Sequence, residues 1–175
     1  MNEAFKQDWK RYKRSEWSRK CLFDLFKSQT MKYILAGRLS DSPIPLKSVC
    51  VGGVQKYLGH KMGCEIGWEH VGSGLVLAHP YGITVNGGAK LGKNCTLFKG
   101  CTIGSVRGGK NAGVPVLGDR VVVCSNAMVC GNITVGSDVL IAAGAYVNFD
   151  VPDNSVVIGK PGVIHHKENP VRYYL

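Results

Sequence analysis

The sequence predicts a mainly β protein in which six-residue repeats form a solenoid, with a small N-terminal α-helical region before it and one extruded loop within it. Three observations support this fold class. Aliphatic residues recur at every sixth position, glycine and asparagine lie between them, and apolar residues near the N-terminus follow a helical spacing instead. With 175 residues, 45% of them hydrophobic, the chain can bury one principal core.

The first 62 residues are expected to be helical. Six large apolar residues lie at near-helical spacing before a break at "DSPIPLK": Phe5, Trp9, Tyr12, Leu22, Leu25 and Phe26. Core packing is the more common role of such residues. Nine lysines or arginines precede residue 33, so this region is also a candidate for peripheral contact with an anionic membrane or polymer, with a solvated helix face as the ordinary alternative.

The solenoid is expected over residues 63–164, followed by a tail at 165–175. One ladder of aliphatic residues consists of Val85, Leu91, Leu97, Ile103, Leu117, Val123, Val129, Val135, Ile141 and Val147. A second ladder lies two residues before the first and consists of Ile83, Ala89, Cys95, Cys101, Val121, Ala127, Ile133, Val139 and Ala145. Residues two apart on a strand face the same side, so each repeat predicts a short strand with two inward side chains.

Two features interrupt the ladders. The segment "GSVRGGKNAGVP" separates them by fourteen residues where twelve would keep the phase, which predicts an extruded loop at 104–116 carrying Arg107 and Lys110. His79 stands six residues before Val85, where the ladder would place an aliphatic residue. A histidine there is a candidate for acid–base chemistry, and a packed, hydrogen-bonded histidine is the alternative.

Charge, cysteine content and the N-terminus limit the setting. The formal net charge of +10 favours anionic ligands. Seven cysteines without a Cys-x-x-Cys pair indicate reduced thiols rather than a zinc clamp. The N-terminus lacks the apolar region of a signal peptide, and no window reaches about eighteen apolar residues, so a cytoplasmic protein is expected.

Four segments resemble the hexapeptide-repeat acyltransferases: "LAHPYGITV", the insertion after "TIGS", "GNITVGSDVLIAAGAYV" and "VPDNSVVIGKPGVI". Their order resembles the serine acetyltransferase branch, and more closely its relatives in capsule and exopolysaccharide pathways. The resemblance covers about residues 60–164. It implies a left-handed parallel β-helix, a homotrimer, acetyl-coenzyme A as co-substrate, and neither a metal nor a nucleic-acid partner.

The resemblance also implies a catalytic apparatus. His79 matches the base that takes the proton of an acceptor hydroxyl, with direct transfer and no acetyl-enzyme. Glu65 in "GCEIG" matches the carboxylate that orients this base, although the family usually has aspartate there. The backbone amide of Gly104 matches the donor to the developing oxyanion.

The donor site is expected along the later coils and the loop. Small residues there would let an extended pantetheine lie close to the backbone, and Lys160 in "IGKPG" would meet a phosphate of coenzyme A. In the family this groove runs between neighbouring subunits of the trimer. The expected cofactor-binding residues are Gly104, Arg107, Lys110, Ala127, Ala142, Ala143, Gly144 and Lys160.

Three departures from the serine-using members bear on the acceptor. Those members carry an aspartate before the base and an Arg-His pair in the loop, where this chain has Ala78, Gly113 and Val114. Lost charge-assisted contacts disfavour serine, so a hydroxyl of a sugar or polysaccharide precursor is predicted as the acceptor, with serine as the alternative. Asp8 in "DWKRY" matches an aspartate near the acceptor pocket of the polysaccharide relatives. The expected acceptor-binding residues are Asp8, Ala78 and Val114.

Two further hypotheses remain open. A zinc hydratase on the same coils would need three well-placed histidines, and only His79 lies within the regular repeats. The other histidines are His60, His70, His165 and His166. A basic binding solenoid without catalysis needs no ligand to be stable. A metal assay tests the hydratase, and coenzyme A binding tests the solenoid.

Overall fold

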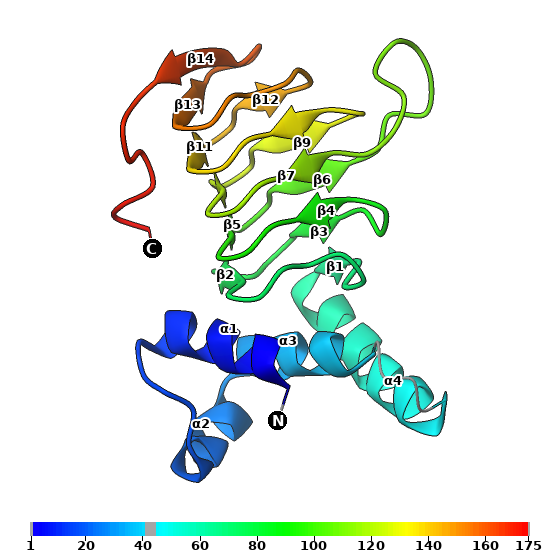
Figure 1. Ribbon diagram of the computed structural model, residues 1–175. Coiled ribbons are helices and arrows are strands. Elements are labelled where there is room, and N and C mark those ends of the chain that lie inside the picture. Colours follow the sequence, from blue (N-terminus) through cyan, green and yellow to red (C-terminus); the bar gives the residue numbers. More distant parts are fainter. Residues whose placement is uncertain (1, 41–44, 175) are drawn as a thin grey trace.

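The computed structural model describes residues 2–40 and 45–174. Helices form the lower part of the molecule, and a column of β coils stands above them (Figure 1). The predicted fold class, a β solenoid with an N-terminal helical region and one extruded loop, is confirmed.

Within its described residues, the helical region contains four α-helices and one short 3-10 helix. They are α1 (Glu3–Lys13), η1 (Arg19–Cys21), α2 (Leu22–Lys27), α3 (Gln29–Ser40) and α4 (Pro45–Met62). The side chain of Asn2 caps α1 by accepting hydrogen bonds from the backbone amides of Ala4 and Phe5. No helix among the described residues is both long enough and apolar enough to cross a membrane.

The predicted apolar stripe is only partly buried. Phe5, Trp9 and Leu25 lie in the core. Leu22 and Phe26 were expected to pack as well, but they are 45% and 72% exposed. The reason is that α2 has only six residues, and of these only Leu25 is buried.

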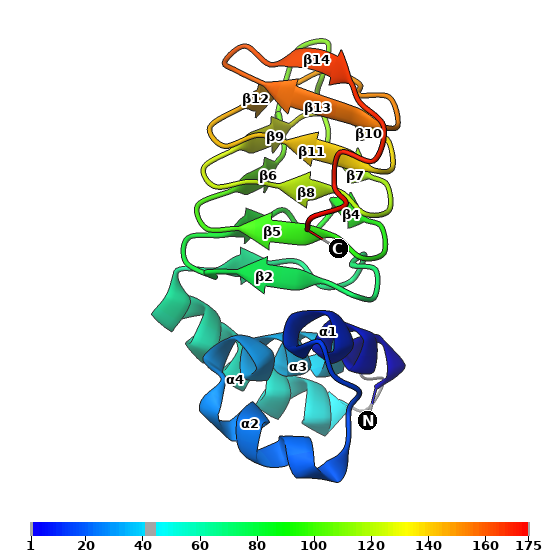
Figure 2. The same cartoon turned by 90° about the vertical axis from the view of Figure 1, so that its left-hand side faces the viewer.

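Fourteen strands form the coils. They are β1 (Glu65–Ile66), β2 (Val76–Ala78), β3 (Thr84–Val85), β4 (Lys90–Leu91), β5 (Thr96–Phe98), β6 (Thr102–Gly104), β7 (Val116–Leu117), β8 (Val122–Val123), β9 (Met128–Cys130), β10 (Thr134–Val135), β11 (Val139–Ile141), β12 (Tyr146–Val147), β13 (Ser155–Ile158) and β14 (Val163–His166). They make three sheets, in the orders β1-β3-β6-β9-β12, β10-β7-β4 and β14-β13-β11-β8-β5-β2. Figure 2 shows the third sheet face-on, with the strands of successive coils stacked above one another.

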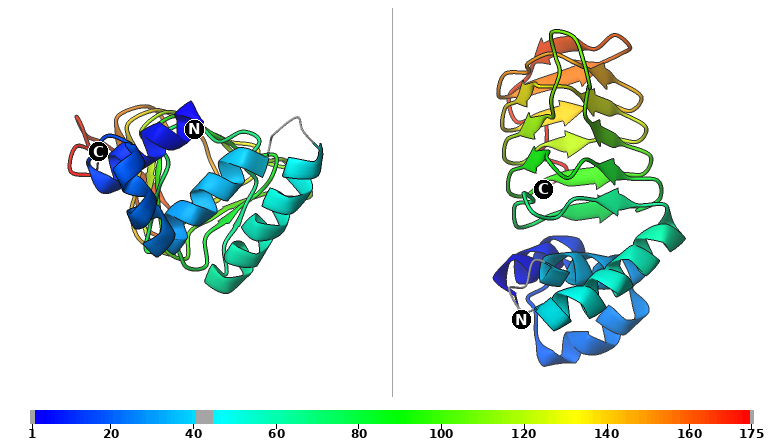
Figure 3. Two further views of the ribbon diagram at one scale, coloured as in Figure 1. Left: turned by 90° about the horizontal axis from the view of Figure 1, so that it is seen from below. Right: turned by 90° about the vertical axis from the view of Figure 1, so that its right-hand side faces the viewer.

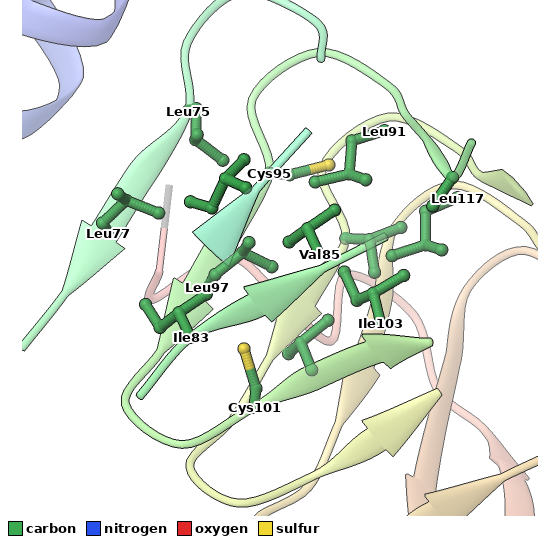
Figure 4. Packing of buried hydrophobic residues seen from close by; sticks show 14 of the residues in the cluster. Leu75, Leu77, Ile83, Val85, Leu91, Cys95, Leu97, Cys101, Ile103 and Leu117 are labelled. Carbon is green, nitrogen blue, oxygen red and sulfur yellow. The ribbon is translucent and has the colours of Figure 1, made fainter. Parts of the chain in front are cut away.

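Each coil visits the three sheets in turn, so the column has three faces around one interior. Neighbouring strands pair in parallel, except that β14 returns antiparallel to β13. All nineteen ladder residues predicted from the sequence point into this interior, and none is more than 4% exposed. Figure 4 shows their packing in the lower coils. Burial raises the pKa of the ladder thiol of Cys101 to about 12, so this cysteine packs as a small neutral hydrophobe.

The corner that contains His79 departs from the regular repeat. The core residues on either side of it are Leu77 and Val85, eight positions apart instead of six. Two extra residues therefore sit in this corner, and His79 is exposed there. The prediction that His79 occupies a ladder position is wrong, because it assumed a constant period through the first coil.

The extruded loop is a hairpin on one edge of the column. Val106 and Gly113 pair with each other through two backbone hydrogen bonds of 3.0 and 2.9 Å. The loop is also tied to later coils, since the side chain of Asn111 donates to the carbonyl of Asn148 at 2.6 Å and its carbonyl accepts from the amide of Asn132 at 2.9 Å. Figure 1 shows it projecting from the upper half of the column.

A buried ion pair joins the helices to the first coil. Arg38 of α3 donates from Nε and Nη2 to the two carboxylate oxygens of Asp8 of α1, at 2.9 and 3.1 Å. Asp8 also accepts from the backbone amide of Leu75 at 2.7 Å. Arg38 further donates to the carbonyls of Val71 and Gly72. These contacts hold α1 against the first coil, and Figure 3 shows the helices beneath the column.

Candidate active site

His79 lies immediately after β2, in a pocket of about 440 Å³. Four parts of the chain form its walls: the end of α1, the strand β2 with the corner after it, the strand β5, and the C-terminal tail. The lining residues are Arg11, Tyr12, Arg14, Val76, Ala78, His79, Pro80, Tyr81, Thr96, Phe98 and Tyr174. The pocket therefore combines segments that are far apart in the sequence.

The backbone and ring of His79 are both unusual. Its φ of 52° is in the left-handed region, which non-glycine residues rarely adopt. Elsewhere in the column, residues with positive φ recur at one position of the tight corners. In the corner that contains His79, Gly82 occupies that position, so the positive φ of His79 is additional to the regular pattern. Among the described residues, neither ring nitrogen of His79 makes a hydrogen bond or ion pair. An exposed imidazole without a protein partner is available to exchange a proton with a ligand, and strained backbone of this kind is common at functional sites.

Glu65 does not contact His79 within one chain. It is an exposed residue at the start of β1, one coil below, and it lines a separate pocket of about 570 Å³ together with Lys56 and His60 of α4. No hydrogen bond joins Glu65 to His79 in the part of the chain that the structure describes. The two coils do meet nearby, since the thiol of Cys64 donates to the carbonyl of Pro80 at 3.0 Å.

Gly104 and the loop lie at the far edge of the sheet from His79. The strands β3 and β6 are parallel neighbours in one sheet, with Thr84 paired to Thr102. His79 lies before the start of β3, whereas Gly104 is the last residue of β6, so the two residues lie at opposite edges of this sheet. Arg107 and Lys110 are exposed in the loop that leaves from this edge. Val114 is at the base of the same loop. A single chain therefore does not bring the predicted oxyanion donor or the loop cations to His79.

The other expected cofactor residues lie at the corner above His79. Ala142, Ala143 and Gly144 follow β11, which belongs to the same sheet as β2, and Lys160 follows β13 of that sheet. Ala143, Gly144 and Lys160 are exposed, and Ala142 is half-buried. These four residues and the loop thus occupy two different edges of the column.

Ala127 was expected to contact the cofactor, and the structure contradicts this. Its side chain is only 1% exposed because it is a ladder residue that points into the column. Its backbone is also engaged, since its carbonyl accepts from Thr102 at 2.9 Å and its amide donates to Cys124 at 3.2 Å.

Asp8 was expected near the acceptor, and this is also wrong. The carboxylate is fully buried beside Arg38 and does not line the His79 pocket. Burial raises the pKa of Asp8 above its ordinary value of 3.8, while the hydrogen bond and charge of Arg38 act in the opposite direction. Its role is to hold the helices against the first coil.

Nine of the eleven residues that line the His79 pocket were not predicted as site residues, and four of these nine come from α1 and the C-terminal tail: Arg11, Tyr12, Arg14 and Tyr174. The tail reaches the pocket by running back down the column after β14, as Figure 2 shows. The ring of Tyr174 meets that of Phe98 edge-on at 5.9 Å. Contacts between residues 11 and 174 leave no periodic signal in a sequence.

The histidines that a zinc hydratase would need are dispersed. His60 is on α4, His70 follows β1, and His165 and His166 are on β14. Within the described ranges, 2–40 and 45–174, no group of three or more His, Cys, Asp or Glu side chains is placed to hold one metal ion.

Comparison with known proteins gives one consistent result. No family model matches the sequence. The serine acetyltransferase of Synechococcus elongatus is 36% identical over 99 residues, which cover 55% of this chain and 40% of that protein. The crystal structure of serine acetyltransferase from Neisseria gonorrhoeae has a TM-score of 0.75 at 28% identity, covering 94% of this chain and 66% of that one. The same enzyme in complex with serine gives 0.72 at 27%, covering 93% and 68%.

In sequence and fold, the chain is similar to hexapeptide-repeat proteins of the serine acetyltransferase type, and its coils are those of a left-handed parallel β-helix. It spans about half the length of the curated relatives it matches. The predicted closeness to the capsule and exopolysaccharide relatives is wrong, and so is the sugar acceptor predicted from the replacement of charged residues by Ala78, Gly113 and Val114. The relatives and solved structures named above are serine acetyltransferases.

Proposed function

We propose that the chain transfers an acetyl group from acetyl-coenzyme A to the hydroxyl of L-serine, with His79 as the general base. The main support is the likeness to serine acetyltransferases in both sequence and fold, which includes an enzyme solved with serine bound. The exposed, unpartnered imidazole of His79 beside a pocket of about 440 Å³ is consistent with this chemistry.

The proposed reaction needs one proton carrier. The serine hydroxyl enters the pocket, and a ring nitrogen of His79 takes its proton as the oxygen attacks the thioester carbonyl. The carbonyl oxygen gains negative charge, for which the backbone amide of Gly104 is the proposed donor. The tetrahedral intermediate then collapses, the carbon–sulfur bond breaks, and the imidazolium returns the proton to the leaving thiolate of coenzyme A. No acetyl-enzyme forms.

This apparatus requires more than one chain. Gly104, Arg107 and Lys110 lie at one edge of the column, whereas His79 and Lys160 lie at another. We infer a homotrimer in which the loop edge of one subunit faces the His79 edge of its neighbour. Exposed Arg107, Lys110 and Lys160 are then the proposed partners of the coenzyme A phosphates. Glu65 is the proposed orienting carboxylate, and contact with His79 would require its side chain to move.

The acceptor site differs from that of the serine enzymes. Ala78 lines the pocket where those enzymes have an aspartate, and Gly113 and Val114 replace their Arg-His pair. Serine is therefore proposed to be held by other groups of this pocket. The competing hypothesis, a basic solenoid without catalysis, predicts no acetyl transfer to any hydroxyl.

The test is to incubate the purified full chain with acetyl-coenzyme A and L-serine, and to detect O-acetylserine and free coenzyme A by mass spectrometry. L-Threonine, L-homoserine and a panel of other hydroxyl compounds serve as comparison acceptors. The proposal predicts equimolar O-acetylserine and coenzyme A, faster with serine than with any comparison acceptor. Transfer only to another acceptor would reject serine, and no transfer at all would favour the binding solenoid.

A further inference from the structure

We propose that Arg14 binds the carboxylate of the acceptor in the pocket beside His79, so that acceptors are selected for a carboxylate next to the reacting hydroxyl. The inference rests on the proposed function, and it adds a residue and a chemical requirement. The charged residues that hold serine in the related enzymes are missing from this chain, and Arg14 is proposed to take over the contact with the carboxylate.

The charge of the pocket is one-sided. Two arginines and one histidine line it, and none of its described lining residues is acidic. An anionic group is therefore stabilised there, and a second cation is not. Among the charged parts of L-serine, the carboxylate matches this field.

The two arginines have different roles. Arg11 already makes four hydrogen bonds: from Nη1 to the carbonyls of Gly74 and Cys95 at 2.5 and 3.1 Å, and from Nη2 to Thr96 Oγ1 and the carbonyl of Tyr174 at 3.1 and 3.2 Å. Only its Nε–H has no acceptor among the described residues. Burial lowers the pKa of Arg11 from its ordinary value, because removal from water disfavours the charged guanidinium. Arg11 thus holds α1 and the tail against the column.

Arg14, by contrast, has no hydrogen bond or ion pair among the described residues, and it is exposed at the pocket wall. Its guanidinium carries a permanent charge and a planar pair of donors that matches both oxygens of a carboxylate. Such a group is the best-suited anion ligand that the pocket offers.

The backbone position of Arg14 is also well defined. Arg14 is the C-cap of α1 with a φ of 54°, which ends the helix and turns the chain at the pocket. Because α1 is anchored through Asp8 and Arg11, the Cα atom of Arg14 is held in a fixed position relative to His79. A carboxylate bound there would orient the rest of the acceptor toward the base.

The ammonium of serine has no acidic partner in the pocket. Four aromatic side chains line it instead, and their ring faces attract cations only weakly: Tyr12, Tyr81, Phe98 and Tyr174. The carboxylate should therefore contribute more to recognition than the ammonium. L-Glycerate, which keeps the hydroxyl and the carboxylate but has no ammonium, should bind, whereas L-serinamide, which has no carboxylate, should bind poorly.

The test compares Arg14→Gln with Lys13→Gln, which removes one positive charge from the neighbouring exposed residue outside the pocket. Both sites are exposed, so both variants should fold. For Arg14→Gln, the KM for L-serine should rise by roughly tenfold or more, the usual cost of a lost charge-assisted pair, while the KM for L-serinamide and for acetyl-coenzyme A stays within about twofold. Lys13→Gln should match the unsubstituted chain. An unchanged KM for serine, or an equal rise for serinamide, would overturn the role of Arg14.

Binding without turnover separates this inference from the proposed function. Titration calorimetry with L-serine and L-glycerate, in the absence of acetyl-coenzyme A, should show binding to the unsubstituted chain and about tenfold weaker binding to Arg14→Gln. If serine is not acetylated but carboxylate binding still depends on Arg14, the proposed function fails and the anchor stands. If serine is acetylated and Arg14→Gln binds both ligands normally, the anchor fails alone. Absence of both binding and transfer rejects both.

Discussion

His79 lies at a corner of the first coil and not in the aliphatic core. The sequence pattern marks it as an exception to the ladder, but the ladder does not pass through this residue. Counting back six from Val85 puts His79 in the core, whereas the true core residue is Leu77 and the corner holds two extra residues. The sequence does not reveal the two-residue insertion in this corner, because the pattern offers no means of telling whether His79 or Leu77 is the core position.

Asp8 illustrates the reverse error, in which a structural residue was interpreted as a functional one. Replacement of Asp8 by Asn should leave Arg38 as a buried charge without a counter-ion, since the Arg38 side chain is only 6% exposed. We expect the free energy of unfolding to fall by about 3–5 kcal/mol. The measurement is urea denaturation, with Glu3→Gln as the control, because the Glu3–Lys6 pair is exposed and its loss should change stability by less than about 0.5 kcal/mol. Equal effects of the two substitutions would contradict the clamp.

At the scale of elements, the repeat predicted the strands well because one periodic signal specifies both the strand and its buried face. Every ladder residue is in the core. The roles of the glycines were less visible. Gly92 does not have a positive φ; instead, its corner lies so close to the next coil that an added Cβ would be 2.5 Å from the carbonyl oxygen of Gly118. Close approach between coils depends on stacking, which sequence period alone does not reveal.

Two glycine substitutions test this account of the corners. Gly92→Ala should lower the free energy of unfolding by about 1–3 kcal/mol, because the new methyl group would overlap the backbone of the coil above. Gly87→Ala has open space around the added atom and ordinary φ, so its effect should lie between neutral and about 1 kcal/mol of stabilisation. Both are measured by thermal unfolding followed by circular dichroism. Similar losses for the two variants would mean that coil spacing does not depend on Gly92.

The helices and the tail were harder to predict than the coils. Leu22 and Phe26 follow a helical spacing yet remain exposed, because spacing defines a face but not what covers it. The tail completes the His79 pocket through contacts of Tyr174 with Arg11 and Phe98. Such long-range contacts form only after the column sets the path of the tail.

For the whole molecule, the division of the proposed site between two edges of the column predicts an oligomer, and the resemblance to the hexapeptide-repeat acyltransferases implies a homotrimer. Sedimentation equilibrium at micromolar concentration should therefore give a mass of three 18.9 kDa chains. A monomer that still turns over acetyl-coenzyme A would contradict the shared site, since Gly104 and His79 of one chain lie at opposite edges of the same sheet.

His79 is the proposed base of the acetyl transfer to serine. The most direct measurement is the turnover of acetyl-coenzyme A and L-serine by His79→Asn, alongside His70→Asn as an exposed histidine outside the pocket. We predict that His79→Asn keeps the thermal midpoint and coenzyme A affinity of the unsubstituted chain, because no core residue changes, while turnover falls by roughly 100-fold to 10,000-fold. His70→Asn should be unaffected. Normal turnover by a folded His79→Asn protein would show that His79 is not the base.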